Sequence, residues 1–315
     1  MARILITPRS LTSEPPKELD PLRVAGHELV FCTAGKMPDE AELLALVPDI
    51  DGWLAGVEPV SNAVIAAAER LRVISRNGSG ADNIPMEKID ERGIVLERAM
   101  AANATGVAEL AIALALAACR KLPEVATGVR EGGWPRPKGR EIEGMTVGVV
   151  GVGAIGRKFA RVMAELGANI VAVDPAQPDL GSLAGKVEYV GFDELVRRAE
   201  IISFHCPMPA DNRPLLDVGR IERLRPSVIV INTARAGLID EAAMLDALGQ
   251  ERVAAYATDV FNTEPPPPGG LAAHPRVIAT SHIGGLTDES ISRATRIAVE
   301  NLLRHLGTEK QNAAK

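Results

Sequence analysis

Short runs of Val, Ile and Leu recur along the chain, and most are followed by a longer stretch with the spacing of an amphipathic helix. The runs lack polar alternation, which is typical of strands that are buried on both faces of a sheet. Strands that alternate with helices in this way form parallel sheets covered by helices. The sequence therefore predicts an α/β fold with doubly wound parallel sheets. The expected strands are residues 4–7, 27–31, 52–55, 73–75 and 94–96, then 146–150, 170–174, 187–190, 201–205, 228–232, 255–259 and 277–280.

The length of the chain indicates the number of domains, and its composition indicates the class of protein. The 315 residues suffice for about two domains at ~150 residues each, and the apolar share of 46% excludes global disorder. The net charge of −6 and the nine aromatic residues oppose nucleic-acid binding, which uses basic stripes and stacking rings. Between the two series of strands we expect a helix over residues 105–121, stopped by Pro123, and then a loop rich in Gly and Pro over residues 132–139. A last helix is expected over residues 288–306.

Cysteines and apolar stretches indicate the compartment. Cys32, Cys119 and Cys206 form neither a disulfide framework nor a zinc-binding spacing, so we expect a reducing compartment and no metal. The most apolar stretch, residues 107–118, contains Glu109 and is too short to span a bilayer. The first ten residues lack the apolar core of an export signal. We therefore expect a cytoplasmic protein that binds no membrane.

A glycine-rich loop with Gly151, Gly153 and Gly156 directly follows an expected strand and opens a helix. Asp174 comes eighteen residues after Gly156, at the end of the next expected strand. In dinucleotide-binding folds such glycines let the backbone approach the pyrophosphate at a helix N-terminus, and the acid accepts hydrogen bonds from the adenosine ribose. The alternative is a glycine-rich turn that only packs a helix on a strand. None of the three residues after Asp174 is a cation that would meet a 2′-phosphate, so the sequence favours NAD over NADP.

The five histidines differ in the position that the expected strands give them. His27, His274 and His305 lie before a strand, in a loop and on the last helix, where a solvated or capping role is expected. His205 and His282 lie at the carboxyl ends of strands, the edge that forms the ligand crevice of a doubly wound sheet. His205 is followed by Cys-Pro, which suggests a wall beside the adenosine. His282 is followed by Ile-Gly-Gly, which allows a ligand to approach the backbone, so His282 is the stronger candidate for proton transfer.

Two further charged residues come at strand ends, Arg235 and Glu264. Reduction of a keto acid requires a guanidinium that binds the carboxylate and polarises the carbonyl. It also requires an imidazolium that delivers a proton and a carboxylate that orients this ring. Arg235, His282 and Glu264 supply these three groups. The alternative is a surface Arg–Glu pair with a capping histidine.

Four segments carry a resemblance to a known family. Residues 230–241 (V-I-N-T-A-R-A-G-L-I-D-E), 259–265 (D-V-F-N-T-E-P), 281–285 (S-H-I-G-G) and 76–83 (R-N-G-S-G-A-D-N) resemble motifs of the D-isomer-specific 2-hydroxyacid dehydrogenases. The similarity covers nearly the whole chain and is strongest to the branch of D-3-phosphoglycerate dehydrogenases and hydroxypyruvate reductases. Ala236 stands where this family usually has Gly, and Ser281 stands where it has Pro.

The resemblance implies a set of functional residues. It makes Arg235, Glu264 and His282 the catalytic set of an NAD-dependent enzyme that exchanges hydride between C2 of a small 2-hydroxy acid and the nicotinamide. It implies that Asp259 holds the carboxamide. Other cofactor-binding residues are then Gly151, Gly153, Ala154, Ile155, Gly156, Asp174, Cys206, Thr233, Ala234 and Gly284. The implied substrate residues are Arg76, Asn77, Gly78, Ser79 and Gly80, which bind the substrate carboxylate largely through backbone N–H groups.

The resemblance also implies the domain organisation. A Rossmann NAD-binding domain of residues 100–285 is expected to be inserted into a flavodoxin-like catalytic domain of residues 1–99 and 286–315. A homodimer joined through the NAD-binding domains is expected. The chain ends without the regulatory domain of longer relatives, so feedback by serine through such a domain is not expected.

The identity of the acid stays open. In the D-3-phosphoglycerate dehydrogenases that the chain resembles, a basic side chain just after the third strand binds the substrate phosphate. The same stretch here, residues 54–59, has no arginine and has an added acid, Glu58. Arg9 and Arg76 are the basic residues that would replace the missing basic side chain in part. The alternatives are therefore 3-phosphoglycerate and an unphosphorylated acid such as glycerate, hydroxypyruvate or glyoxylate. Two other classes remain as alternatives, an NAD(H)-sensing binding protein and a dehydrogenase of the formate type.

Overall fold

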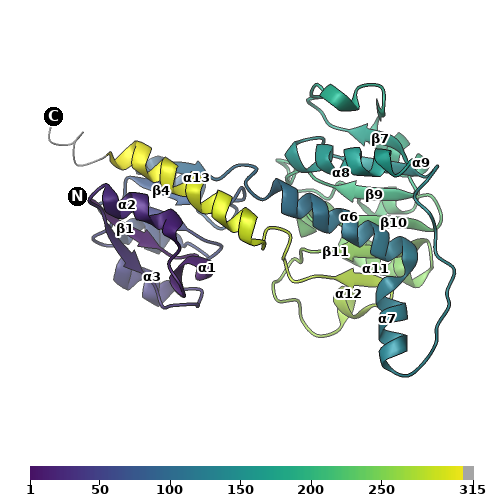
Figure 1. The fold of residues 1–315 in the computed structure, drawn as a ribbon, viewed down its shortest axis with the longest axis horizontal. Helices are drawn as coiled ribbons and strands as arrows, with labels where there is room; N and C mark the ends of the chain where they lie inside the picture. The colour runs from purple at the N-terminus through teal and green to yellow at the C-terminus, as the bar shows by residue number, and fades with distance from the viewer. Residues whose placement is uncertain (308–315) are drawn as a thin grey trace. The chain divides into compact units, whose positions relative to one another are not determined.

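Two parallel β-sheets organise the residues that this computed structural model describes, which are residues 1–307. The first unit consists of Met1–Asn103 and the segment that starts at Thr287, and the second unit is Ala104–Leu286. The predicted architecture of two α/β domains with parallel sheets is confirmed (Figure 1). None of the helices within residues 1–307 is long and apolar enough to cross a membrane.

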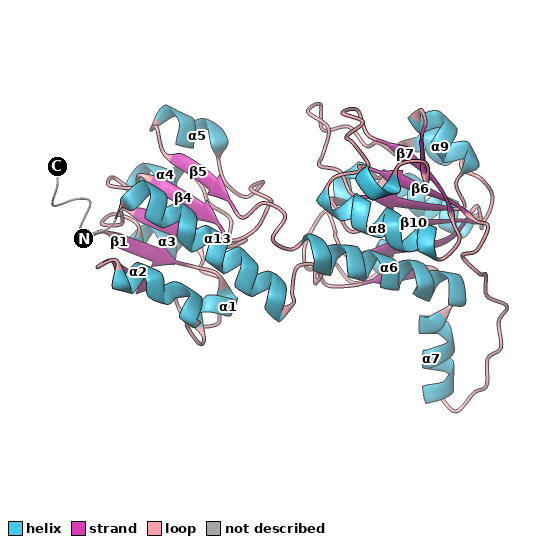
Figure 2. Ribbon diagram, turned by 45° about the horizontal axis from the view of Figure 1, so that its top comes forward, coloured by secondary structure: helices cyan, strands magenta, loops and turns pink. Residues whose placement is uncertain are grey.

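The first unit is built on a five-stranded parallel sheet in the order β2-β1-β3-β4-β5, with helices on both of its faces (Figure 2). Every residue of β3 and β4 is buried, as expected for central strands without polar alternation. The strands are β1 (Arg3–Ile6), β2 (Glu28–Phe31), β3 (Gly52–Ala55), β4 (Val73–Arg76) and β5 (Val95–Arg98). The helices are α1 (Arg9–Thr12), η1 (Lys17–Leu19), α2 (Asp20–Val24), α3 (Glu40–Leu46), α4 (Asn62–Ala67), α5 (Met86–Glu91) and α13 (Asp288–Leu306).

Successive residues of the central strands pack into two different cores, because side chains alternate between the faces of a sheet. Trp53 belongs to the core that includes residues of α3 and α4. Leu54 belongs to the core on the other face, which includes Ala298 and Leu302 of α13. The last described helix therefore completes the core of the first unit, although its residues are far from the strands in the sequence.

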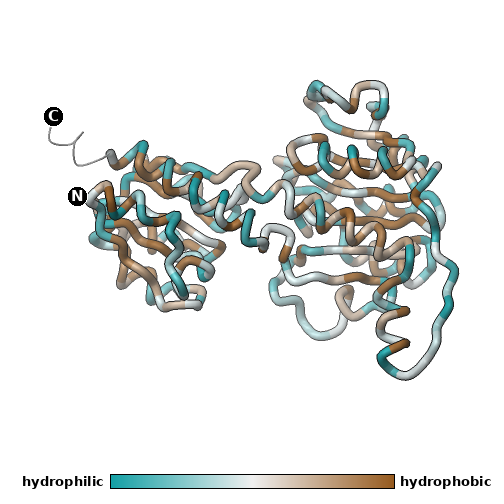
Figure 3. The backbone as a smooth tube through the Cα atoms, in the orientation of Figure 1, coloured by the Kyte–Doolittle hydropathy of each residue, from teal (hydrophilic) through white to brown (hydrophobic). Residues whose placement is uncertain are grey.

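The second unit is built on a seven-stranded parallel sheet in the order β12-β11-β10-β9-β6-β7-β8. The hydrophobic segments concentrate in its strands, and the connecting loops are more polar (Figure 3). The strands are β6 (Thr146–Val150), β7 (Asn169–Val173), β8 (Val187–Tyr189), β9 (Ile201–Phe204), β10 (Val228–Asn232), β11 (Val253–Thr258) and β12 (Val277–Ala279). The helices are α6 (Ala104–Arg120), α7 (Leu122–Arg130), α8 (Ala154–Glu165), η2 (Gly181–Leu183), α9 (Phe192–Arg198), α10 (Val218–Ile221), η3 (Ala236–Leu238), α11 (Glu241–Gly249) and α12 (Gly270–Ala273).

The strand order reverses once in each sheet, between β1 and β3 in the first unit and between β6 and β9 in the second. At such a switch point the loops on either side diverge to opposite faces of the sheet and leave a crevice beyond the carboxyl ends of the strands. Each unit thus has one edge that is predisposed to hold a ligand.

The region after α6 differs from the sequence prediction. The helix expected over residues 105–121 corresponds to α6, but Pro123, the residue expected to stop it, is the second residue of a further helix, α7. Proline is tolerated in the first turn of a helix because the N–H that it lacks has no helical partner there. The break between the two helices falls at Lys121, where the expected helix ends, and the φ of this residue, 51°, is left-handed.

The first prediction concerns the packing of α8 on the glycine loop. A Cβ at Gly156 would lie 1.9 Å from the carbonyl oxygen of Gly151, whereas a Cβ at Gly153 would meet nothing within 4 Å. We expect Gly156→Ala to lower the free energy of unfolding by about 2–3 kcal/mol, because backbone atoms have to shift. Gly153→Ala is the matched control and should change it by less than about 1 kcal/mol. Urea unfolding measures both, and equal effects of the two substitutions would contradict the packing.

Candidate active site

The glycine loop lies at the switch point of the second sheet. Gly151 has a φ of +90°, and a Cβ there would lie 2.8 Å from the carbonyl oxygen of His205 in the neighbouring loop. Gly153 precedes α8, and no side chain caps that end of the helix. The first N–H groups of a helix have no partner within the helix, and the helix dipole attracts negative charge to this end. The loop therefore offers the close approach and the donors that a pyrophosphate requires.

Asp174 directly follows β7 and contacts this loop. Its Oδ2 accepts a hydrogen bond from the backbone N–H of Val152 at 2.8 Å, and its Oδ1 accepts one from Ala176 at 3.0 Å. A carboxylate has about four acceptor positions, so further donors are accommodated. The carboxylate is therefore held beside the glycine loop, with capacity left for the hydroxyl groups of a ribose.

The loops after β9 and β10 carry the next cofactor candidates. The Oγ1 of Thr233 is buried and has no hydrogen-bond partner among the described residues. Buried hydroxyl groups rarely remain unpaired, so this atom fits a contact with a bound molecule. Burial raises the pKa of the Cys206 thiol to about 11, so the thiol stays protonated and contributes volume rather than charge. These features, with the glycine loop and Asp174, fit a dinucleotide; Ala154 and Ile155 form the first turn of α8, and Ala234 follows Thr233.

His205 does not have the surroundings of a proton donor. Its Nε2 lies 2.9 Å from the Oγ of Ser203, its Nδ1 is buried, and its ring lies 5.0 Å from that of Phe159 between centroids. Burial lowers its pKa to about 3, so the ring is neutral at physiological pH. These surroundings support the interpretation of His205 as part of the wall beside the adenosine of the cofactor.

His282 and Glu264 form a hydrogen-bonded pair. The His282 Nδ1 lies 2.8 Å from the Glu264 Oε2, and both side chains are partly exposed, at 52% and 38%. The other carboxylate oxygen of Glu264 accepts the N–H of Phe261 at 3.1 Å, which fixes the carboxylate. With Nδ1 engaged, the Nε2 atom of His282 is the one that remains for a substrate.

Asp259 holds the loop that carries His282. It is 2% exposed, and its carboxylate accepts hydrogen bonds from the Thr280 hydroxyl at 2.6 Å and from the N–H groups of Ile283 and Gly284 at 2.8 Å each. His282 itself has a left-handed φ of 57°, which is uncommon for a residue other than glycine. The buried Asp259 carboxylate stabilises this conformation through its hydrogen bonds to the next two residues, Ile283 and Gly284. Sequence reasoning assigned Asp259 to the carboxamide and missed this anchoring role.

Arg235 lies in the loop after β10, on the same edge of the sheet. β10, β11 and β12 are neighbours in register, so the loops that carry Arg235, Glu264 and His282 leave adjacent strands. The Arg235 Nη1 donates to the carbonyl oxygen of Ala234 at 2.8 Å. The Asn232 side chain shapes this loop, because it accepts the Ala234 N–H at 3.1 Å and donates to the Arg235 carbonyl at 2.8 Å.

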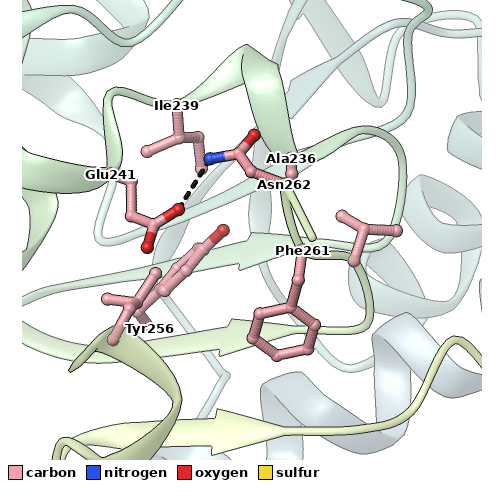
Figure 4. A pocket seen from close by; sticks show the side chains of 8 residues that line it. Ala236, Ile239, Glu241, Tyr256, Phe261 and Asn262 are labelled. Atoms are coloured by element: carbon pink, nitrogen blue, oxygen red, sulfur yellow. Dashed lines mark hydrogen bonds between the residues drawn. The ribbon is translucent and has the colours of Figure 1, made fainter. Parts of the chain in front are cut away.

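A small cavity lies between the segments that carry Arg235 and Glu264 (Figure 4). Ala236 lines it from the first segment, and Phe261 and Asn262 line it from the second. The Asn262 Nδ2 donates to the Glu241 Oε2 at 2.6 Å, as the dashed line in Figure 4 shows. This bond connects α11, the helix after the loop of Arg235, to the loop that carries Glu264. The link between these two distant residues has no signal in the sequence.

The first unit contains the expected substrate loop, residues 76–80, at the end of β4. The N–H groups of Asn77 and Gly78 donate to carbonyl oxygens of the protein, at 2.9 and 2.8 Å. Among the described residues, the N–H groups of Ser79 and Gly80 have no such acceptor, and the buried Oδ1 of Asn77 has no partner. Two backbone N–H groups, those of Ser79 and Gly80, are therefore available to a carboxylate, fewer than the four amides expected from the sequence. Arg76 is 8% exposed beneath this loop.

Comparison with known proteins places these features. The sequence model of the D-isomer specific 2-hydroxyacid dehydrogenase NAD binding domain matches residues 112–284. A D-3-phosphoglycerate dehydrogenase of Mycobacterium tuberculosis is 38% identical over 275 residues, which are 86% of this chain and 52% of that enzyme. A hydroxypyruvate reductase of Thermotoga maritima is 35% identical over 85% of this chain and 89% of its own length. The crystal structure of an NAD⁺-bound 3-phosphoglycerate dehydrogenase of Entamoeba histolytica has a TM-score of 0.82, with 26% identity over 98% of this chain and 97% of that chain.

The strand order of the second unit and the glycine loop at its switch point define a dinucleotide-binding domain. The chain belongs to the D-isomer specific 2-hydroxyacid dehydrogenase family, and its cofactor is NAD. It spans about half the length of the mycobacterial relatives that it matches.

The second prediction follows from the low pKa of His205. In the unfolded chain this imidazole takes up a proton below pH ~6.5, but in the folded protein only near pH 3. The unfolded state therefore binds more protons in this window, and stability decreases as the pH falls through it. Between pH 7 and 5 this group should remove about 2 kcal/mol.

His205→Gln should reduce the loss of stability between pH 7 and 5 by that amount, as measured by urea unfolding at both values. His274→Gln, in the loop after α12, is the control and should leave the loss unchanged. An equal loss in wild type and His205→Gln would show that the imidazole is protonated in the folded protein.

Proposed function

We propose that this chain is an NAD-dependent D-2-hydroxyacid dehydrogenase that interconverts a small 2-hydroxy acid and the corresponding 2-keto acid. The observation that carries the proposal is the 2.8 Å contact between His282 and Glu264, on the strand edge that also carries Arg235. The names of two relatives, a D-3-phosphoglycerate dehydrogenase and a hydroxypyruvate reductase, support the same reaction class.

The proton is handled by His282. Its Nε2 takes the proton from the C2 hydroxyl group in oxidation and returns it to the carbonyl oxygen in reduction. Glu264 accepts the hydrogen bond from Nδ1 and so holds the ring in one orientation and stabilises its charged form. Asp259 acts as a positioning residue because its hydrogen bonds to Ile283 and Gly284 fix the loop that carries His282. NAD, when bound, supplies the site that accepts or donates the hydride.

The substrate carboxylate is bound by charge and by backbone donors. The Arg235 guanidinium offers a planar pair of N–H donors that matches a carboxylate, and it polarises the neighbouring carbonyl. The N–H groups of Ser79 and Gly80 in the first unit are the other donors that we assign to this carboxylate. Binding of the substrate carboxylate is thus shared between the guanidinium group of Arg235 and the backbone of the turn at residues 79–80.

The cofactor is held by the switch-point crevice of the second unit. The glycine loop and the first turn of α8 bind the pyrophosphate, and Asp174 accepts hydrogen bonds from the adenosine ribose. The unpartnered Oγ1 of Thr233 meets the cofactor as well. Cys206, Ala234 and Gly284 line the same crevice from neighbouring loops.

The third prediction tests this function. Arg235→Ala should lose at least about 3 kcal/mol of transition-state stabilisation, roughly a hundredfold or more in kcat/KM. Arg252→Ala is a matched control, because Arg252 is also half-buried in the second unit and its Nη1 donates to one carbonyl oxygen, that of Glu222, at 2.9 Å. The assay follows NADH oxidation with hydroxypyruvate, glyoxylate and 3-phosphohydroxypyruvate.

Two results would contradict the proposal. Unchanged kinetics of Arg235→Ala would remove this residue from the mechanism. A wild-type protein that binds NADH but turns over none of a broad panel of 2-keto acids would support an NAD(H)-sensing binding protein instead.

We also propose that the chain forms a homodimer through the second unit. α7 projects away from its sheet, and none of its residues is buried (Figure 1). Val129 on this helix is 46% exposed and Trp134 in the following loop is 79% exposed, which is costly for large apolar side chains in water. A second copy of this surface would cover them.

The fourth prediction is that the wild-type protein sediments as a dimer, and that Val129→Glu shifts it toward the monomer because a charge would enter an apolar contact. Val218→Glu, at a similarly exposed valine on α10, is the control and should leave the dimer intact. A monomeric wild-type protein in sedimentation velocity would contradict the proposal.

We place the activity in the cytoplasm. Cys32 and Cys119 are buried and Cys206 is half-buried, and all three are free thiols. Reducing compartments keep such thiols unpaired, whereas secreted proteins commonly use cysteines in disulfides.

A further inference from the structure

A buried carboxyl group lies at the ligand edge of the first unit. The Glu58 residue is 1% exposed, and its carboxyl group accepts hydrogen bonds from the Thr7 hydroxyl and, at 2.9 Å, from the N–H of Gly56. A Cβ at Gly56 would lie 2.5 Å from the Glu58 Oε2 and 3.1 Å from the Cα of Pro8. The carboxyl group therefore fills the space between the end of β1 and the end of β3.

The surrounding polar groups hold Glu58 at both ends. The Thr7 hydroxyl that contacts the carboxyl group also accepts the indole N–H of Trp53 at 3.0 Å. The Asn83 side chain donates to the backbone carbonyl of Glu58 at 2.6 Å and to that of Gly56 at 3.3 Å. Since each of these partners is fixed by the sheet or by a neighbouring loop, the position of the carboxyl group is built into the fold.

The place of Glu58 in the topology indicates a role in ligand binding. β1 and β3 flank the switch point of the first sheet, and in sheets of this strand order ligands bind beyond the carboxyl ends at that point. The substrate loop follows β4, the next strand. A Cβ on its Gly78 would lie 3.1 Å from the Arg76 Nη1, so the guanidinium group packs against this loop.

Glu58 and Arg76 act on one another across this edge. Burial raises the pKa of the Glu58 carboxyl group, and the positive charge of Arg76 opposes that shift. Ala55 at the end of β3 pairs with Arg76 at the end of β4, so the two groups belong to neighbouring strand ends. The charge of the ionised carboxyl group weakens the positive potential that an anion would find there.

We propose that Glu58 is a specificity-determining residue that excludes acids with a phosphate group, so that the substrate is an unphosphorylated 2-hydroxy acid or 2-keto acid. The inference rests on the proposed dehydrogenase function and names its substrate class. The carboxyl group already occupies donors that a second anionic group would need, namely the Gly56 N–H and the Thr7 hydroxyl. A phosphate monoester carries about −1.5 to −2 charges at pH 7, so it would meet a like charge at the switch point.

The fifth prediction compares hydroxypyruvate with 3-phosphohydroxypyruvate, with NADH as the reductant, at pH 8. Wild-type protein should prefer hydroxypyruvate at least tenfold in kcat/KM. Glu58→Gln keeps the shape of the side chain and removes its charge, so it should reduce this preference at least about tenfold. The gain should appear mainly in the KM for the phosphorylated acid.

Asp51→Asn is the matched control. Asp51 is a 7% exposed acid that directly precedes β3, at the amino edge of the same sheet, where it accepts hydrogen bonds from the Arg70 side chain at 3.0 and 3.2 Å. Removing its charge should leave the preference between the two substrates unchanged, because its edge of the sheet is opposite to the ligand edge.

The outcomes separate the inference from the proposed function. A wild-type preference for 3-phosphohydroxypyruvate, or an unchanged preference in Glu58→Gln, overturns the inference and leaves the dehydrogenase function intact. Absence of turnover with every 2-keto acid overturns both. If Glu58→Gln does not fold, competitive inhibition of the wild-type protein decides the substrate class: D-glycerate should bind at least tenfold more tightly than 3-phosphoglycerate, and equal or reversed affinities overturn the inference.

Discussion

The parallel alignment of all strands is the constraint on which the candidate site depends. Because every strand of a sheet points the same way, all of its carboxyl ends emerge at one edge, and residues far apart in the sequence are collected there. In the second unit this brings the loops of Arg235, Glu264 and His282 to three adjacent strands. In the first unit it brings Glu58 and the substrate loop to neighbouring ends. The parallel topology thus determines which residues lie near one another, and the individual contacts then fix their orientation.

Fixed carboxyl groups give the two edges their different characters. In the second unit Asp259 takes three protein donors and holds a loop, and Glu264 orients an imidazole. In the first unit Glu58 accepts hydrogen bonds from a hydroxyl group and a backbone amide at the switch point of the sheet. A carboxyl group held by hydrogen bonds from fixed donors is rigid, so each of these three groups acts through its position.

Sequence reasoning predicted the fold well because its signals are local. Runs of apolar residues such as residues 146–150 and 228–232 coincide with β6 and β10, because strands buried on both faces need no alternation. The end of the helix predicted over residues 105–121 agrees with α6, but α7 was missed because proline is compatible with the start of a helix as well as with its end. For the candidate site, residue types at strand ends indicated His282 and Glu264, whose contact is present. The anchoring by Asp259, the Glu241–Asn262 bond and the occupied amides of Asn77 and Gly78 depend on tertiary distances, which no local pattern encodes.

The contribution of α13 to the first core has a consequence for biosynthesis. Leu54 and Val73 are translated early, yet two of the side chains that cover them, Ala298 and Leu302, are translated more than 200 residues later. One apolar face of the first sheet is therefore covered only in part, by Leu11, Leu19 and Leu22, while the second unit is synthesised. Exposed apolar surface of this kind promotes aggregation of a nascent chain. The synthesis of the first unit begins before that of the second, but the first unit completes its core only after the second has been made.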